Sequence, residues 1–126
     1  MSKADTAAAY QDLLDRYRRI SNLWDVQGVL GWDQQVMMPD EGTPARAKQL
    51  STMSSLEHDL VTDEEIDALL EAIDTEELAD EQAGAVREIR RQHERRKRVP
   101  RELVEEISET ASEALPIWKE ARAEDD

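Results

Sequence analysis

The apolar residues of this chain recur with the period of an α-helix, and this pattern constrains the fold more than any other feature. In the first third of the sequence they are three or four residues apart, at Tyr10, Leu13, Leu14, Tyr17, Ile20, Leu23 and Trp24. Such spacing places them on one face of a helix, whereas a half-buried strand requires strict alternation. We therefore expect an all-α fold, an elongated antiparallel helical bundle of about five helices without a sheet. Residues 1–126 are expected to form a single helical unit.

Start and stop signals predict where the helices begin and end. Glycine is a poor helix former, so the first helix is expected to break between Gly31 and Pro39. Thr43 is a suitable N-cap, and Pro44 then occupies the first helical position, where a missing N–H costs nothing. Thr62 opens a capping box for the third helix.

Two further prolines mark the C-terminal part of the chain. The residue before Pro100 ends the fourth helix, because a proline disfavours helical backbone at the preceding position. Pro116 lies inside the predicted fifth helix, where it removes a donor and is expected to cause a kink or restart. The apolar stripes expected to face inward are Leu50, Met53 and Leu56 on the second helix, Ile66, Leu69, Leu70 and Ile73 on the third, Leu78, Val86 and Ile89 on the fourth, and Leu103, Val104, Ile107, Ala111 and Leu115 on the fifth.

The chain is strongly acidic, with 30 acidic and 16 basic residues and a formal net charge of −14. This charge disfavours binding to nucleic acids and to anionic membranes. High charge with low hydrophobicity is typical either of partial disorder or of adaptation to concentrated salt, and the clear helical period favours a halophile-like protein. The sequence lacks cysteine, a signal-peptide pattern and a run of 18 apolar residues, which favours a cytoplasmic protein.

One segment reverses this charge. Residues 87–101 contain eight of the sixteen basic residues and only two acidic ones, Glu88 and Glu94. A basic stripe of this kind could bind RNA or phosphate, but the segment has no interleaved aromatic residues. Ion pairing within the chain or between subunits is the favoured interpretation.

No complete catalytic or metal site is visible. His93 and Glu94 resemble the start of a zinc-binding HExxH motif, but Lys97 stands where the second histidine is required. His93 and His58 are therefore expected to be solvated histidines on helix surfaces. Helix capping and solvation explain the acidic pairs, so no catalytic, cofactor-binding or metal-ligating residue is predicted.

Several motifs in order resemble a known family. The segment from Leu30 to Pro39 contains Trp32 and Asp33, followed by Met38 and Pro39, and the next helix carries Arg46. Together with the segments 100–106 and 118–124, it resembles the N-terminal part of the thermostable (Taq-type) metallocarboxypeptidases. From the residues alone, Trp32 is expected to be a packing anchor whose indole N–H needs a hydrogen-bond partner, and Asp33 to cap a turn or pair with Arg46. The alternative for these two residues is a direct role in substrate binding.

The resemblance implies an all-helical peptidase whose catalytic domain is absent from these 126 residues. The full enzymes release C-terminal amino acids from peptides with zinc or another divalent metal, and they usually form homodimers. Their N-terminal helices form part of the wall or lid of the substrate groove. This chain is accordingly expected to be truncated, inactive alone, and inclined to self-associate or to bind the missing catalytic portion. The alternative is a stand-alone acidic helical module for interaction or oligomerisation.

Overall fold

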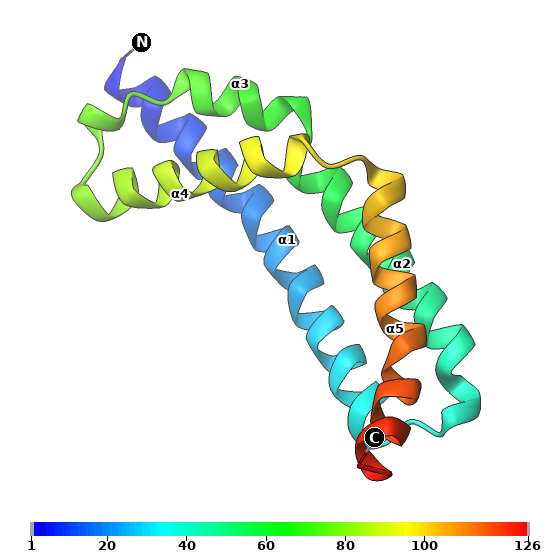
Figure 1. The fold of residues 1–126 in the computed structure, drawn as a ribbon. Helices are drawn as coiled ribbons and strands as arrows, with labels where there is room; N and C mark the ends of the chain where they lie inside the picture. The colour runs from blue at the N-terminus through cyan, green and yellow to red at the C-terminus, as the bar shows by residue number, and fades with distance from the viewer. Residues whose placement is uncertain (1, 126) are drawn as a thin grey trace. The chain divides into compact units, whose positions relative to one another are not determined.

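The computed structural model describes residues 2–125, which form five α-helices and no strand, as predicted. None of these helices is long and apolar enough to cross a membrane. The elements in chain order (Figure 1) are α1 (Lys3–Val36), η1 (Asp40–Gly42), α2 (Thr43–Val61), α3 (Glu64–Ala72), η2 (Thr75–Glu77), α4 (Asp80–Lys97) and α5 (Arg101–Ala123), where η denotes a 3-10 turn.

The chain divides into two compact units. Unit 1 contains the residues up to Ser21 together with Asp59–Val99, and unit 2 contains Asn22–His58 together with the residues from Pro100 onward. Helices α3 and α4 therefore belong to unit 1 and α5 belongs to unit 2, whereas α1 and α2 contribute residues to both.

Helix α1 ends where the sequence predicts. It continues through Gly28 and Gly31 and ends at Val36, within the stretch from Gly31 to Pro39 in which the break was expected, so that prediction is confirmed. A Cβ added at either glycine would meet no atom within 4 Å, so neither glycine is required by close packing. Each costs roughly 1 kcal/mol relative to alanine, and contacts to the last turn of α1, described below, offset that cost.

Unit 1 has an ordinary apolar core. Leu13 from α1 packs with Ile66 and Leu70 from α3 and with Val86 and Ile89 from α4. Leu13, Ile66 and Val86 have no exposed surface. The helical spacing of the sequence predicted these side chains to face inward, and that prediction is confirmed.

Short polar contacts close the connections of unit 1. Asp63, rather than Thr62, is the N-cap of α3, and its carboxylate accepts a hydrogen bond from the amide of Glu65 at 2.9 Å. The predicted N-cap, Thr62, thus lies one residue before the observed one. The buried hydroxyl of Thr6 accepts a hydrogen bond from the amide of Asp74 at 3.2 Å, which ties the start of α1 to the turn after α3.

Unit 2 is packed by small side chains instead. Along α2 the small side chains of Thr43, Ala47, Ser51 and Ser55 form a buried stripe, Glu57 and His58 are buried near its end, and Ser112 is the buried residue of α5. Two serine hydroxyls form a hydrogen bond between α2 and α5: Ser54 Oγ donates to Ser108 Oγ at 3.1 Å.

Half of the apolar residues predicted to face inward in unit 2 are exposed instead. Leu56 on α2 and Leu103 and Ile107 on α5 are 46%, 44% and 58% exposed, and Ala111 is also exposed, so the prediction is wrong for these four. Leu50, Met53, Val104 and Leu115 are half-buried. All eleven exposed large apolar side chains among residues 2–125 belong to unit 2. On α5 the predicted stripe is divided: Val104 and Leu115 are half-buried, whereas Leu103 and Ile107 point outward.

Candidate functional site at the end of α1

Arg46 on α2 holds the end of α1. Its Nη2 donates to Asp33 Oδ2 at 2.9 Å, its Nη1 donates to the carbonyl oxygen of Leu30 at 2.6 Å, and its Nε donates to Gln49 Oε1 at 3.0 Å. The arginine side chain is only 14% exposed. A planar guanidinium suits such a multiply bonded position better than an ammonium would. The pairing of Asp33 with Arg46 expected from the sequence is therefore present.

The other signature residues shape the turn that follows. The carbonyl oxygen of Asp33 accepts hydrogen bonds from the amides of both Met37 and Met38, at 2.9 and 2.8 Å, and ends the helix. Pro39 is in an extended conformation, and its carbonyl accepts from the amide of Gly42 at 2.9 Å. A Cβ on Gly42 would lie 2.9 Å from Met38 Cγ, so the close approach of Met38 requires glycine there.

The structure corrects two predictions in this segment. Trp32 is 58% exposed and is not a packing anchor. The indole bond expected of it is made by Trp24, whose Nε1 donates to the buried Glu57 at 2.9 Å. Thr43 was expected to be the N-cap of α2, but it has helical backbone angles and is the first residue of that helix. The turn η1 directly precedes it.

Gln34 supplies a hydrogen bond that Pro116 cannot make. Helix α5 is continuous through Pro116, although a proline cannot donate to the carbonyl four residues earlier, that of Ser112. Gln34, which is buried near the end of α1, donates from Nε2 to this carbonyl oxygen at 3.4 Å. Two turns after Ser112, Lys119 donates to the carbonyl oxygens of Gln34 and Gln35, at 3.5 and 3.0 Å. These two contacts join α5 to the last turn of α1. No pattern in the sequence predicted the hydrogen bond of Gln34.

A surface hollow of about 630 Å³ lies beside Arg46. Besides Arg46, its lining includes Leu30, Met53 and Lys48. Each nitrogen of Arg46 already has an acceptor within the protein, and Lys48 is bonded to Glu109. Arg46 and Lys48, which line this hollow, are thus both engaged in bonds within unit 2.

The two histidines do not lie on the surface, so that expectation is wrong. His93 has no exposed surface, and His58 is 5% exposed. His93 Nδ1 lies 2.6 Å from the carbonyl oxygen of Val61, and Nε2 lies 2.8 Å from Asp67 Oδ1. Both neighbours are hydrogen-bond acceptors, so the two ring nitrogens are engaged within unit 1. The spacing of His93 after Val86 and Ile89 puts it on the buried face of α4, and this spacing could have predicted its burial.

These contacts do not suit a metal. Both nitrogens of His93 are engaged, and Lys97 Nζ lies 2.9 Å from Asp67 Oδ2, where it would repel a cation. Residues 2–125 contain no group of three or more histidine, cysteine or acidic side chains that could hold one. The zinc that the resemblance implies for the full enzymes therefore has no ligand set in this part of the chain.

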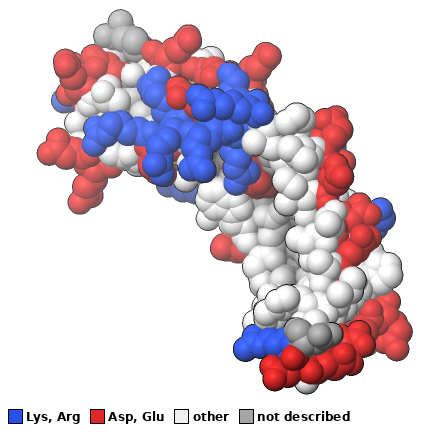
Figure 2. All heavy atoms as spheres, in the orientation of Figure 1, with Lys and Arg blue, Asp and Glu red and all other residues white. Residues whose placement is uncertain are grey.

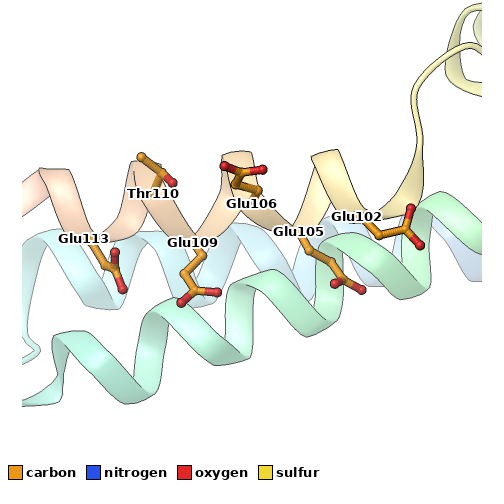
Figure 3. Close-up of a pocket in the computed structure, with 6 residues that line it drawn as sticks. All are labelled: Glu102, Glu105, Glu106, Glu109, Thr110 and Glu113. Carbon is orange, nitrogen blue, oxygen red and sulfur yellow. The ribbon is translucent and has the colours of Figure 1, made fainter.

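The carboxylates of α5 do not form a site either. Glu102, Glu105, Glu106, Glu109 and Glu113, with Thr110, line a shallow hollow of about 350 Å³. Figure 3 shows these carboxylates spread along the helix, with Glu106 directed away from Glu105 and Glu109. They lack the convergence that paired acid catalysis requires.

The basic segment is partly paired within unit 1. Lys and Arg side chains gather over α4 (Figure 2). Arg91 pairs with Glu88, Lys97 with Asp67, and Arg90 donates to the carbonyl oxygen of Leu70 at 3.2 Å. The intramolecular pairing expected from the sequence is present at these positions.

The contact between Gln34 and Ser112 predicts a non-additive pair of substitutions. Gln34→Leu leaves the Ser112 carbonyl without its donor, and we expect it to lower the free energy of unfolding by about 1–3 kcal/mol. With Pro116→Ala the helix supplies its own N–H, so Gln34→Leu should cost roughly 1 kcal/mol less in that background. Urea denaturation of the four proteins measures this coupling, and the exposed Gln35→Leu is the control. Additive effects would contradict the assignment.

Asp67 predicts a pH dependence of stability. The hydrogen bond from Lys97, with a further one from His93, holds the pKa of Asp67 below its usual value. A lowered pKa stabilises the fold above the ordinary value of about 3.9, and this contribution disappears as the pH falls through the folded-state pKa. Asp67→Asn should therefore reduce the free energy of unfolding near neutral pH and have little effect at about pH 2. Exposed Glu71→Gln is the control, and an equal loss at both pH values would contradict the ion pair.

Comparison with known proteins identifies the lineage. Residues 12–126 match the family described as carboxypeptidase Taq (M32) metallopeptidase. The chain is 36% identical over 123 residues to thermostable carboxypeptidase 1 of Thermus thermophilus, an alignment covering 94% of this chain and 24% of that protein. It is 38% identical over 117 residues to thermostable carboxypeptidase 1 of Pyrococcus furiosus, covering 92% of this chain and 23% of the relative. The chain thus spans about a quarter of the length of these relatives. It belongs to the M32 carboxypeptidase Taq family.

Proposed function

We propose that this chain is the N-terminal helical portion of a zinc-dependent carboxypeptidase, an enzyme that releases C-terminal amino acids from peptides, and that it is inactive alone. The observation that carries the proposal is a family match over residues 12–126 by a chain about a quarter as long as its relatives. The sequence has two histidines, and neither belongs to an HExxH motif. Metal, general base and substrate anchor must then come from the remainder of the enzyme.

The proposed role is structural, as wall or lid of a peptide-binding groove. Two features support it. Arg46 fixes the angle between α1 and α2 through Leu30 and Asp33, which gives a rigid elbow. Unit 2 turns large apolar side chains such as Val29, Trp32 and Ile117 outward, as a portion covered by further protein would do.

Transfer of this chain into a relative tests the proposal. The purified chain, supplied with zinc and an N-blocked dipeptide, should release no C-terminal amino acid above the blank. A chimera in which it replaces the matching part of the Thermus thermophilus relative should regain release, because the elbow and the apolar faces meet their partners. Arg46→Met in the chimera should reduce activity, and exposed Arg19→Met should not.

Two outcomes would contradict the proposal. Release of amino acids by the 126-residue chain alone would refute its inactivity. A chimera that is helical and binds zinc but does not hydrolyse the dipeptide would refute the role in the groove.

A second candidate function is a stand-alone interaction module. The observation in its favour is unit 1, which covers its own core and needs no further chain to do so. Homodimer formation and adaptation to concentrated salt stay predictions. Sedimentation at low and at multimolar salt separates the candidates: a folded, discrete oligomer at both favours the module, and aggregation or molten behaviour favours the enzyme portion.

A further inference from the structure

Helix α5 has three distinct faces. One face contacts the rest of unit 2: Ser108 and Ser112 accept hydrogen bonds from Ser54 and Gln34 respectively, Ser112 through its carbonyl oxygen. Lys119 lies on the same face, seven residues after Ser112. Because successive residues are turned by about 100° around a helix, large side chains elsewhere on α5 point away from this contact.

The second face is an exposed apolar ridge. We define the α5 ridge as Leu103, Ile107, Ala114, Ile117 and Trp118. Its four large members are 44%, 58%, 70% and 56% exposed, in that order. Leu103, Ile107, Ala114 and Ile117 are separated by four, seven and three residues, the spacing of a seam between two helices. A helix that exposes such a stripe leaves an unpartnered surface.

The third face is a row of carboxylates beside the ridge. We define the acidic row as Glu102, Glu106, Glu109 and Glu113, which are four, three and four residues apart. Glu109 is bonded to Lys48, whereas the other three form no ion pair within residues 2–125. Like charges three or four residues apart repel one another, so a cationic partner along this row would stabilise it. In Figure 2 uncharged side chains and a band of acidic ones lie next to each other where α5 is drawn in Figure 1.

We propose that the α5 ridge and the acidic row together bind one amphipathic helix, whose apolar stripe is flanked on one side by lysine or arginine. The ridge would supply the buried area and the row would select the orientation and the partner, as flanking charges do in helix pairs. The proposal goes beyond the carboxypeptidase assignment and does not depend on it.

A second copy of this chain is a poor occupant of the ridge. Unit 2 contains fourteen acidic and five basic residues, a formal charge of −9. The basic residues of the chain gather on α4, but the apolar stripe of that helix, Val86 and Ile89, is already buried in unit 1. No described helix therefore offers a free apolar stripe with a basic flank.

A pair of synthetic helical peptides tests the proposal on the intact chain. Both are three heptads long with leucine at the a and d positions, and the flank carries lysine in one and glutamate in the other. We expect fluorescence anisotropy to detect binding of the lysine peptide, with at least about tenfold weaker binding of the glutamate peptide near 0.1 M salt, where charges in contact are still felt.

Variants of the chain locate the binding site. Ile107→Ser with Ile117→Ser should weaken binding at least about tenfold, since each removes apolar area from the seam. Glu102→Gln, Glu106→Gln and Glu113→Gln together should remove the preference for lysine. Matched controls are Val26→Ser with Leu56→Ser, and Asp25→Asn with Asp40→Asn and Glu41→Gln, which should leave both affinities unchanged.

Three outcomes would overturn the proposal. Equal affinity for the two peptides would remove the acidic row from the site. No binding of the lysine peptide to the folded chain would remove the site altogether. Dimerisation of the chain that is lost in the Ile107→Ser, Ile117→Ser variant would assign the ridge to a second copy. The comparison of peptides uses the unaltered chain, so it stands even if a variant fails to fold.

Discussion

The helices of unit 2 meet through serine and alanine, and the other properties of that unit depend on this constraint. Ala47, Ser51 and Ser55 on α2 are buried, as is Ser112 on α5. Small side chains bury little apolar area, so the contact relies on hydrogen bonds such as those from Ser54 to Ser108 and from Gln34 to Ser112. The large side chains of α5 are left outside. The same constraint therefore explains the polar interior of unit 2 and its apolar exterior.

Unit 1 is packed differently, because its core is apolar and few polar side chains are buried in it. Its apolar core is continuous from α1 to α4, and His93 is the large polar side chain buried at its side. That ring joins the carbonyl of Val61, at the end of α2, to Asp67 on α3. A buried histidine with acceptors at both nitrogens therefore joins α2, α3 and α4. His93 and Glu94 resemble the start of a zinc-binding motif, but the position of His93 is explained by its packing between helices.

The sequence predicted the helices and the core of unit 1 because the period of apolar residues is a local property. Leu13, Ile66 and Val86 lie where that period places them. The same reasoning failed for Leu103 and Ile107, because periodicity shows which residues share a face and not whether this chain covers it. The bond from Gln34 to Ser112 depends on Pro116, far along the chain, so no local pattern could reveal it. The pairing of Asp33 with Arg46 was accessible, since two opposite charges flank one predicted turn.

Unit 1 covers its own core, whereas unit 2 exposes apolar faces that are suited to further protein. Amide hydrogen exchange of the isolated chain, measured residue by residue, tests this difference, because protection reports local opening. We expect the slowest amides to lie in unit 1, including those of Val86 and Ile89, and the amides of α5 around Ile107 to exchange markedly faster. Equal protection of α5 and the core of unit 1 would contradict it, since unit 2 would then be as stable as a unit with a closed core.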